Sequence, residues 1–354
     1  MKDGVRTDEV LEGERAEVLL DRTPFYAESG GQVGDQGVFE SEELRFEVEA
    51  CRAPVLGYHI HLGLVQRGTL VVGGEVGAIV EEAKRKSTQL NHTATHLLQS
   101  ALQEILGDHV KQAGSLVARD RLRFDYTHFS ALNSRERTRI EETINNHIRS
   151  NAAVRWEEIP IDEALAQGAM ALFGEKYGDI VRMVSVDSIS KELCGGTHTL
   201  ASGDIGLFKI VHEGSVSSGV RRIEAVTGAE ALYYVQKGEI ELLRVSELLK
   251  TSPLKVLERM EKLLEEQKQV EKDLQVFKNR MASDQSEDLI SRARDVAGTQ
   301  VIAEQVKGSD PKALRELVDV VKGKIKSGVV VLATDAGGKV ALVIGVTKDL
   351  TNQF

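Results

Sequence analysis

The chain has 354 residues, of which 41% are hydrophobic and 28% are charged, a composition typical of a globular protein with two or three domains. It contains no run of about 18 apolar residues, which predicts no membrane span, and its first residues lack the apolar core of a signal peptide. We therefore expect a cytoplasmic protein. The formal net charge of −10 disfavours nonspecific coating of nucleic acid, whereas a local basic face remains compatible with it. Two cysteines are too few for a disulfide framework.

Residues 1–85 are predicted to form a small β-rich, barrel-like subdomain. Ala16–Leu20 and Leu44–Val48 are short runs typical of strands. Glycine pairs at 30–31 and 73–74 punctuate the segment in a way that suits tight turns.

Residues 86–228 are predicted to form an α+β domain. Apolar residues recur at helical spacing from Thr88 to Leu106, and the following glycine ends that helix. A second helix is expected from Ser134 to Ser150, with Asn133 or Ser134 as its N-cap. Strands are expected at residues 115–118, 121–126, 180–186 and 207–212.

Residues 229–296 are predicted to form a helical stalk that is broken at residues 251–253. Beyond the break, two seams repeat every seven positions, which predicts a coiled coil. The preceding helix, 229–249, is the natural partner in an antiparallel hairpin, and a dimeric coiled coil is the alternative. The seams are Val256, Leu263, Val270 and Phe277, and Met260, Gln267, Leu274 and Met281.

Residues 297–354 are predicted to form an incomplete α/β domain. A strand at 300–306 precedes a helix that opens at Asp310 and Pro311 and runs to 325. A β-hairpin then covers 328–334 and 339–346, with its turn at 335–338. No second crossover helix follows.

Two residue pairs predict a metal site. His92 and His96 are four apart on the first predicted helix, so both imidazoles project from one face. Cys194 and His198 are also four apart, with two glycines between them that suit a tight loop. Together they make a Cys-His₃ set suited to one tetrahedral zinc ion, either in a chemical role or as a structural staple. The residue after His92 is not glutamate, which disfavours a zinc peptidase.

These paired motifs resemble the editing domain of alanyl-tRNA synthetases, which is shared with free-standing alanyl-tRNA editing proteins and with threonyl-tRNA synthetases. Residues 4–9 resemble the linker that enters this domain, and the coiled coil and tail resemble the family's tRNA-binding C-terminal domain. Three further stretches match the alanyl branch: TPFYAESGGQVGD at 23–35, VKQAGSLV at 110–117 and GVRRIEA at 219–225.

The resemblance implies a fragment of a longer synthetase or a shortened stand-alone relative. We find nothing that resembles the class II aminoacylation domain, so ATP-dependent ligation of alanine to tRNA(Ala) is expected only of a full-length enzyme. This chain is expected to hydrolyse mischarged Ser-tRNA(Ala) and Gly-tRNA(Ala). An alanine site discriminates poorly against serine and glycine, which makes a second, hydrolytic site necessary.

The resemblance also assigns roles to residues. One zinc ion per chain would be held by the two histidines of the helix and by Cys194 and His198. It would activate water, polarise the ester carbonyl or position the substrate, and a closed shell of four protein ligands favours the last two. Gln112 is expected in the pocket, where its amide offers both a donor and an acceptor to a serine hydroxyl. Thr93 and Gly31 are the other candidate catalytic residues.

The candidate contacts with substrate and tRNA lie in two stretches. Gly30 and Gln32 belong to a glycine loop whose backbone amides are expected near the ester or ribose. Arg221 and Arg222 are expected at phosphates of the acceptor end, with ion pairs to Glu224 or Glu230 as the alternative.

Two other interpretations remain open. The first is a non-catalytic tRNA-binding fragment with a structural zinc ion, and the second is a free-standing trans-editing hydrolase. In each case tRNA(Ala) is the expected partner, and a homodimer would form through the C-terminal region.

Overall fold

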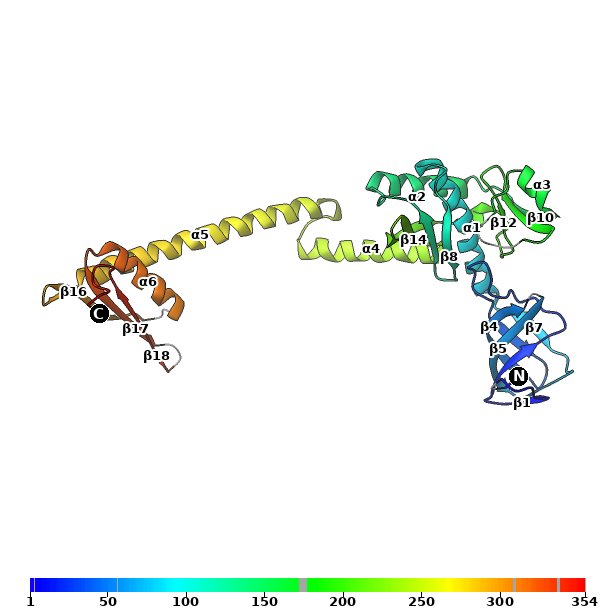
Figure 1. Cartoon of the computed structure of the whole chain (residues 1–354), viewed down its shortest axis with the longest axis horizontal. Coiled ribbons are helices and arrows are strands. Elements are labelled where there is room, and N and C mark those ends of the chain that lie inside the picture. Colours follow the sequence, from blue (N-terminus) through cyan, green and yellow to red (C-terminus); the bar gives the residue numbers. More distant parts are fainter. Residues whose placement is uncertain (3, 56, 172–176, 308–309, 336–337, 354) are drawn as a thin grey trace. The chain divides into compact units, whose positions relative to one another are not determined.

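The computed structural model describes residues 1–2, 4–55, 57–171, 177–307, 310–335 and 338–353 (Figure 1). These residues form two compact units, Met1–Ile240 and Glu241–Phe354. Helices and several separate sheets make a mixed α+β fold, as the sequence predicts. Within the described ranges, no helix is both long and apolar enough to cross a membrane. The four domain limits expected from the sequence stay predictions.

The first unit begins with a five-stranded antiparallel sheet in the order β2-β5-β4-β3-β7. Strands β1 and β6 pair in a separate ladder. The barrel-like prediction is corrected here, because no ladder in the described part of this sheet joins its edge strands β2 and β7, whereas a closed barrel pairs every edge. The strands are β1 (Glu9–Leu11), β2 (Arg15–Leu19), β3 (Gly37–Glu40), β4 (Arg45–Val55), β5 (Tyr58–Arg67), β6 (Thr69–Val71) and β7 (Gly77–Val80).

Aromatic side chains fill the interior of this sheet. Phe39 stacks on Phe46 with ring centres 5.5 Å apart, and Phe25 meets Phe39 edge-on at 5.6 Å. His61 is fully buried among them, where its Nδ1 contacts the carbonyl of Val18 at 3.1 Å and its Nε2 contacts the hydroxyl of Thr23 at 2.9 Å. Burial disfavours the imidazolium and lowers the pKa of His61.

This buried imidazole makes stability depend on pH. Because the folded-state pKa of His61 lies below its unfolded value of about 6.5, the unfolded chain takes up the proton first as the pH falls. We therefore expect His61 to contribute a decrease in the free energy of unfolding below about pH 6.5, of at most about 1.4 kcal/mol per pH unit. Urea unfolding followed by circular dichroism between pH 5 and 8 measures this slope. His61→Gln should flatten it and His59→Gln should not; equal slopes in both variants would contradict the assignment.

Helix α1 (Glu82–Leu106) follows the sheet and carries the first two predicted metal ligands. It begins at 82 rather than at the expected 88, because residues 82–87 favour helix and Lys86 pairs with Glu82 one turn away. Leu97, Leu98 and Leu102 on its inner face are fully buried. They belong to the core that α1 shares with a four-stranded sheet.

This sheet has the antiparallel order β13-β14-β9-β8, and helix α2 packs beside α1 and against β13. A capping box between Asn133 and Glu136 begins α2, which confirms the expected N-terminus. Strand β14 was not predicted, because adjacent Arg221 and Arg222 interrupt the alternation of polar and apolar residues that is typical of a strand. The elements are β8 (Gln112–Val117), β9 (Leu122–Thr127), α2 (Ser134–Arg149), β13 (Phe208–Ser217) and β14 (Val220–Thr227).

A three-stranded antiparallel sheet, β10-β11-β12, carries the second pair of predicted ligands just beyond its last strand. Only β11 was predicted; β10 is a mostly exposed edge strand whose charged residues hide the strand pattern. The elements here are β10 (Val154–Pro160), α3 (Ile161–Ala166), β11 (Ile180–Val186), β12 (Ser190–Leu193) and the 3₁₀ turn η1 (Ser202–Ile205).

Helix α4 (Gly228–Leu248) contains the division between the two units. The predicted break is confirmed, because a 3₁₀ turn, η2 (Pro253–Lys255), separates α4 from α5 (Val256–Ser291). Along α5, seam residues such as Val270 and Phe277 are largely exposed. The pairing of these helices as a coiled coil stays a prediction.

The second unit ends in a mixed sheet, β15-β16-β17-β18. Strands β16 and β17 are parallel and are joined by helix α6, whereas the other two ladders are antiparallel. Leu314 and Val321 of α6 pack on Ile302 and Val330 of the sheet. The predicted turn falls partly on residues 336–337, outside the described residues. The elements are β15 (Arg294–Val296), β16 (Thr299–Gln305), α6 (Pro311–Lys324), β17 (Gly328–Asp335) and β18 (Val340–Val346).

Candidate metal centre

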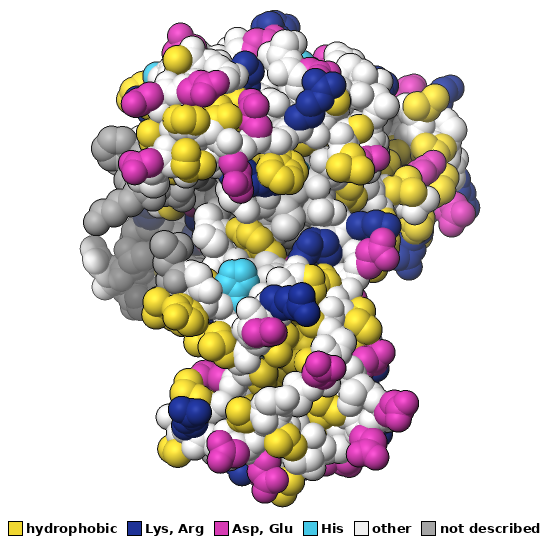
Figure 2. Space-filling model, turned by 90° about the vertical axis from the view of Figure 1, so that its right-hand side faces the viewer, with side chains coloured by type: hydrophobic (Ala, Val, Ile, Leu, Met, Phe, Trp, Pro, Cys, Tyr) yellow, Lys and Arg dark blue, Asp and Glu magenta, His cyan; other side chains and the backbone are white. Residues whose placement is uncertain are grey.

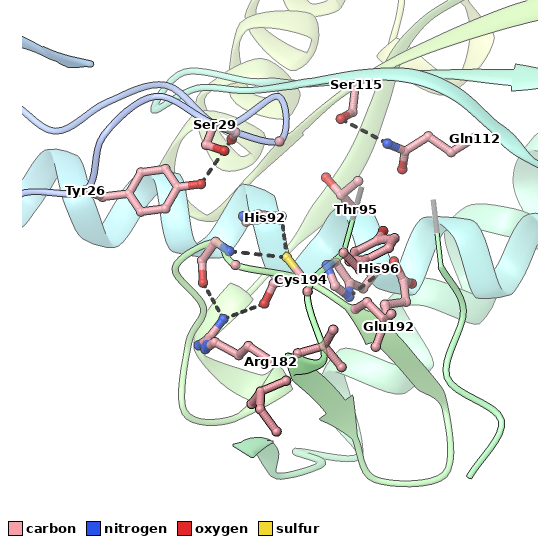
Figure 3. Close-up of a pocket in the computed structure, with 18 residues that line it drawn as sticks. Tyr26, Ser29, His92, Thr95, His96, Gln112, Ser115, Arg182, Glu192 and Cys194 are labelled. Atoms are coloured by element: carbon pink, nitrogen blue, oxygen red, sulfur yellow. Dashed lines mark hydrogen bonds and ion pairs between the residues drawn. The ribbon is translucent and has the colours of Figure 1, made fainter. Parts of the chain in front are cut away.

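Four side chains from two distant segments of the first unit meet in one cluster, and Figure 3 labels three of them, His92, His96 and Cys194. Helix α1 supplies His92 and His96, both buried, and the loop after β12 supplies Cys194 and His198. Their ligand atoms all lie within 4.8 Å of one another. The Sγ of Cys194 lies 3.4 Å from Nε2 of His92 and 3.3 Å from Nε2 of His198. The fold thus joins residues that are 98 positions apart in the chain (194 − 96).

These distances fit a tetrahedral metal site. Bond lengths of about 2.3 Å from zinc to sulfur and about 2.0 Å to nitrogen imply a sulfur-to-nitrogen separation of about 3.5 Å. The observed 3.3 and 3.4 Å lie close to that value. Three imidazoles and one thiol form a nitrogen and sulfur set that softer divalent cations prefer. The chain therefore has a cluster that could hold a metal ion.

Charge also prepares the cluster for a cation. Burial disfavours the thiolate of Cys194, but the neighbouring His92 and hydrogen bonds from the imidazoles outweigh this and hold the pKa of the thiol well below its usual range. Burial and the adjacent His92 lower the pKa of His198 to about 3, so this imidazole stays neutral. Thiolate and neutral imidazole are the forms that bind metal. Burial lowers the pKa of His96, but Glu192 and Cys194 outweigh this and raise it to about 9, so this imidazole must release a proton when a cation binds.

Gln32 contacts both the ligand His92 and the loop that carries Cys194 and His198. Its Oε1 lies 2.6 Å from Nδ1 of His92 and accepts the backbone N–H of Thr197 at 2.9 Å. Its Nε2 donates to the hydroxyl of Thr197 at 2.9 Å. The contact at Nδ1 leaves Nε2 of His92 facing the cluster. Gln32 is fully buried, and its side chain contacts the rear of a ligand; the expected approach of its backbone amide to the substrate stays a prediction.

Two further groups support the remaining histidines. The carboxylate of Glu192 faces Nδ1 of His96 at 3.5 Å, which leaves Nε2 toward the cluster. The hydroxyl of Thr93 lies 3.2 Å from Nδ1 of His198. Thr93 is fully buried and contacts the back of a ligand, a place that suits orientation of the ring.

A cavity of about 280 Å³ opens on the ligands. His92, His96 and Cys194 line it together with Gln112, whose Nε2 donates to the hydroxyl of Ser115 at 3.2 Å (Figure 3). The structure thus places Gln112 at the same cavity as three predicted ligands. Gly30 lines the cavity as well.

Gly31 closes the loop against β8. It has a φ of +80°, and a Cβ there would lie 2.7 Å from the carbonyl oxygen of Ser115. Its own carbonyl accepts the N–H of Val117 at 2.7 Å. Only glycine fits this approach, which keeps the loop beside Gln112.

The two predicted tRNA-binding arginines do not line this cavity. Arg221 pairs with Glu213 at 2.5 Å across the β13–β14 ladder. Arg222 makes a two-pronged ion pair with Asp125, at 2.6 and 2.8 Å. The two arginines thus form ion pairs, but with Glu213 and Asp125 instead of the Glu224 or Glu230 of the alternative, and their contact with phosphates of the acceptor end stays a prediction.

Sequence reasoning missed Arg182. It lies on β11, where one Nη donates to the carbonyls of Cys194 and Gly196, each at 2.8 Å, and so fixes the ligand loop (Figure 3). A lone arginine within the apolar run 180–184 was the available signal. Glu192, two residues before Cys194, follows Lys191 in a polar stretch and carried no such signal.

Comparison with protein families places the chain in a class. Residues 1–84 match the family model for class II (A) tRNA synthetases, and residues 181–224 match the model for the threonyl and alanyl tRNA synthetase second additional domain. The second match contains Arg182, Glu192, Cys194 and His198. The class is that of aminoacyl-tRNA synthetases. The first match confirms the resemblance of residues 1–84 to part of a class II synthetase, whereas the expectation that the chain has no aminoacylation domain stays a prediction.

Individual relatives narrow the class. The chain is 49% identical over 353 residues to the alanine–tRNA ligase of Aromatoleum aromaticum and 47% identical over 354 residues to that of Burkholderia cenocepacia. It is 46% identical over 354 residues to that of Paraburkholderia phytofirmans. Each comparison covers 99% of this chain and 40% of the relative. The chain belongs to the alanine–tRNA ligase family and spans about 40% of the length of these relatives.

Proposed function

We propose that the chain hydrolyses mischarged aminoacyl-tRNA, chiefly Ser-tRNA(Ala) and Gly-tRNA(Ala), at the cavity beside the metal cluster. The observation that carries this proposal is that Gln112 lines the same cavity as His92, His96 and Cys194. A match to a domain described for threonyl and alanyl tRNA synthetases, over residues 181–224, supports it.

The ion would be one Zn²⁺ per chain, held by the two histidines of α1 and by Cys194 and His198. Bound zinc supplies a Lewis acid for an ester carbonyl and a fixed charge that positions the substrate. Four protein ligands close the shell, which favours positioning or polarisation over water activation. Gln32 and Arg182 would keep the ligands in register through their hydrogen bonds to His92 and to the loop carbonyls.

Selection would come from the cavity and Gln112. The cavity, about 280 Å³, is smaller than the roughly 300–1,000 Å³ of sites for drug-sized molecules, and so suits a small aminoacyl group. The Gln112 amide can donate to and accept from a serine hydroxyl, whereas an alanine methyl offers that amide no hydrogen bond.

A second candidate function is a non-catalytic tRNA-binding fragment. The closed set of four protein ligands favours it, because structural zinc sites have this form. The wider context belongs to the proposal as well: tRNA(Ala) as partner, a cytoplasmic location, a homodimer through the C-terminal region, and ATP-dependent ligation of alanine by a complete relative.

Deacylation assays separate the two functions. Purified chain is mixed with Ser-tRNA(Ala), Gly-tRNA(Ala) and Ala-tRNA(Ala), and release of the amino acid is followed with and without a zinc chelator. We expect rapid release of serine and glycine, slow release of alanine, and loss of all release after chelation. Binding of tRNA without release of serine would favour the non-catalytic fragment.

Gln112→Ala should reduce discrimination rather than folding. Loss of one hydrogen bond to the serine hydroxyl should lower the ratio of serine to alanine release by about 3- to 10-fold. The free energy of unfolding should change by less than about 1 kcal/mol. Gln66→Ala, an exposed glutamine on β5, is the matched control. An unchanged ratio in Gln112→Ala would place this residue outside the selecting part of the site.

A further inference from the structure

A second cavity adjoins the ligand loop. Its volume is about 590 Å³, within the range of small-molecule sites. Arg182, Gly195 and Gly196 line both this cavity and the one at the metal cluster. A ligand that occupied both would therefore pass directly beside the metal ligands.

The described charged side chains that line this second cavity are all basic. Arg155 and Arg182 line it, and no acidic side chain does among the described residues that form it. The chain as a whole carries a net charge of −10, and on the face shown in Figure 2 acidic side chains are interspersed with basic ones. A lining with two cations and no acid thus suits an anion such as a phosphodiester.

Trp156 provides a flat apolar surface at this cavity. It lies on the edge strand β10, and 60% of it is exposed. The guanidinium of Arg182 lies over its ring, 5.0 Å from the ring centre. Because Arg182 is itself fixed by the carbonyls of Cys194 and Gly196, the ring is braced against a rigid partner.

We propose that Trp156 and the two arginines form a subsite for an unpaired nucleotide of a single-stranded RNA end, with the base stacked on the indole and a phosphate at Arg155. Exposed aromatic rings beside cations are the usual means of holding single-stranded nucleic acid. The proposal rests on the function given above, since an RNA end that carries the ester at the metal cluster must place its nucleotides nearby. Trp156 is then a positioning residue for the deacylation.

Tryptophan fluorescence tests the subsite directly, because Trp156 is the single tryptophan of the chain. The probe is a four-nucleotide single-stranded RNA that ends in a 3′ adenosine, and the comparison is an abasic oligonucleotide of the same charge. We expect saturable quenching by the RNA and little quenching by the abasic probe. Equal quenching by both, or none by either, would overturn base stacking.

Variants separate stacking from folding. The affinity for the fluorescein-labelled RNA should fall about 10-fold in Trp156→Ala, recover in Trp156→Phe and stay unchanged in Phe129→Ala, an exposed aromatic residue that does not line the cavity. In deacylation assays, Trp156→Ala should raise KM without changing kcat or the zinc content. Unchanged affinity and KM in Trp156→Ala would refute the subsite.

The same experiments distinguish this inference from the proposed function. Serine release by the wild-type chain, without RNA quenching, would leave the hydrolase standing and remove the subsite. Quenching and a Trp156-dependent affinity without serine release would support the subsite and contradict the hydrolase. Tight binding of a protein at Trp156 in place of RNA would also contradict the assignment of this cavity to an RNA end.

Discussion

Replacing Cys194 with alanine is expected to remove the metal ion and the deacylase activity together. Its Sγ lies 3.3 to 3.4 Å from two imidazole nitrogens, so one cation could bind the thiolate and both nitrogens together. Three imidazoles remain without the one anionic ligand, and metal affinity falls steeply. We expect zinc to drop from one per chain to background, and serine release to fall on the order of 100-fold or more.

Elemental analysis and serine release, measured on the same preparation, check this result. The matched control is Cys51→Ala, because Cys51 is the other cysteine and lies in the core of the N-terminal sheet, away from the cluster. It should keep full zinc content. One zinc ion per chain in Cys194→Ala would show that the ligand assignment is wrong.

A single methyl group at Gly196 should disrupt the site nearly as strongly. A Cβ at this position would overlap the ring of His92 and approach Oε1 of Gln32 to 2.9 Å. Neither group can retreat easily, because Gln32 is fully buried and holds both the ring and Thr197. We expect Gly196→Ala to lower zinc affinity by about 10- to 100-fold, with a parallel loss of serine release.

The neighbouring Gly195 provides the matched control. A Cβ at Gly195 meets no atom within 4 Å, so Gly195→Ala adds the same methyl group without a clash. Competition with a chromophoric zinc chelator gives both affinities. If the two variants bind zinc equally well, the tight packing of Gly196 against His92 does not control the site.

Local patterns in the sequence predicted the parts of this protein that depend on near neighbours. The spacing of His92 and His96 follows from the helical repeat, and α1 does bring both rings to one face. The same holds for the capping box of α2 and for the break at η2. Charged residues on the exposed strand β10 hid its period, because an edge strand has little apolar surface to reveal it.

The sequence by itself therefore determined the longer helices, the donor set and the two short ligand motifs. Only the tertiary structure decided that these motifs meet, that the N-terminal sheet stays open, and that Gln32, Glu192 and Arg182 support the ligands. Gln32 contacts His92 across 60 positions and Thr197 across 165. Such contacts depend on how separate elements pack, and no periodicity within a single element encodes the partner of a side chain.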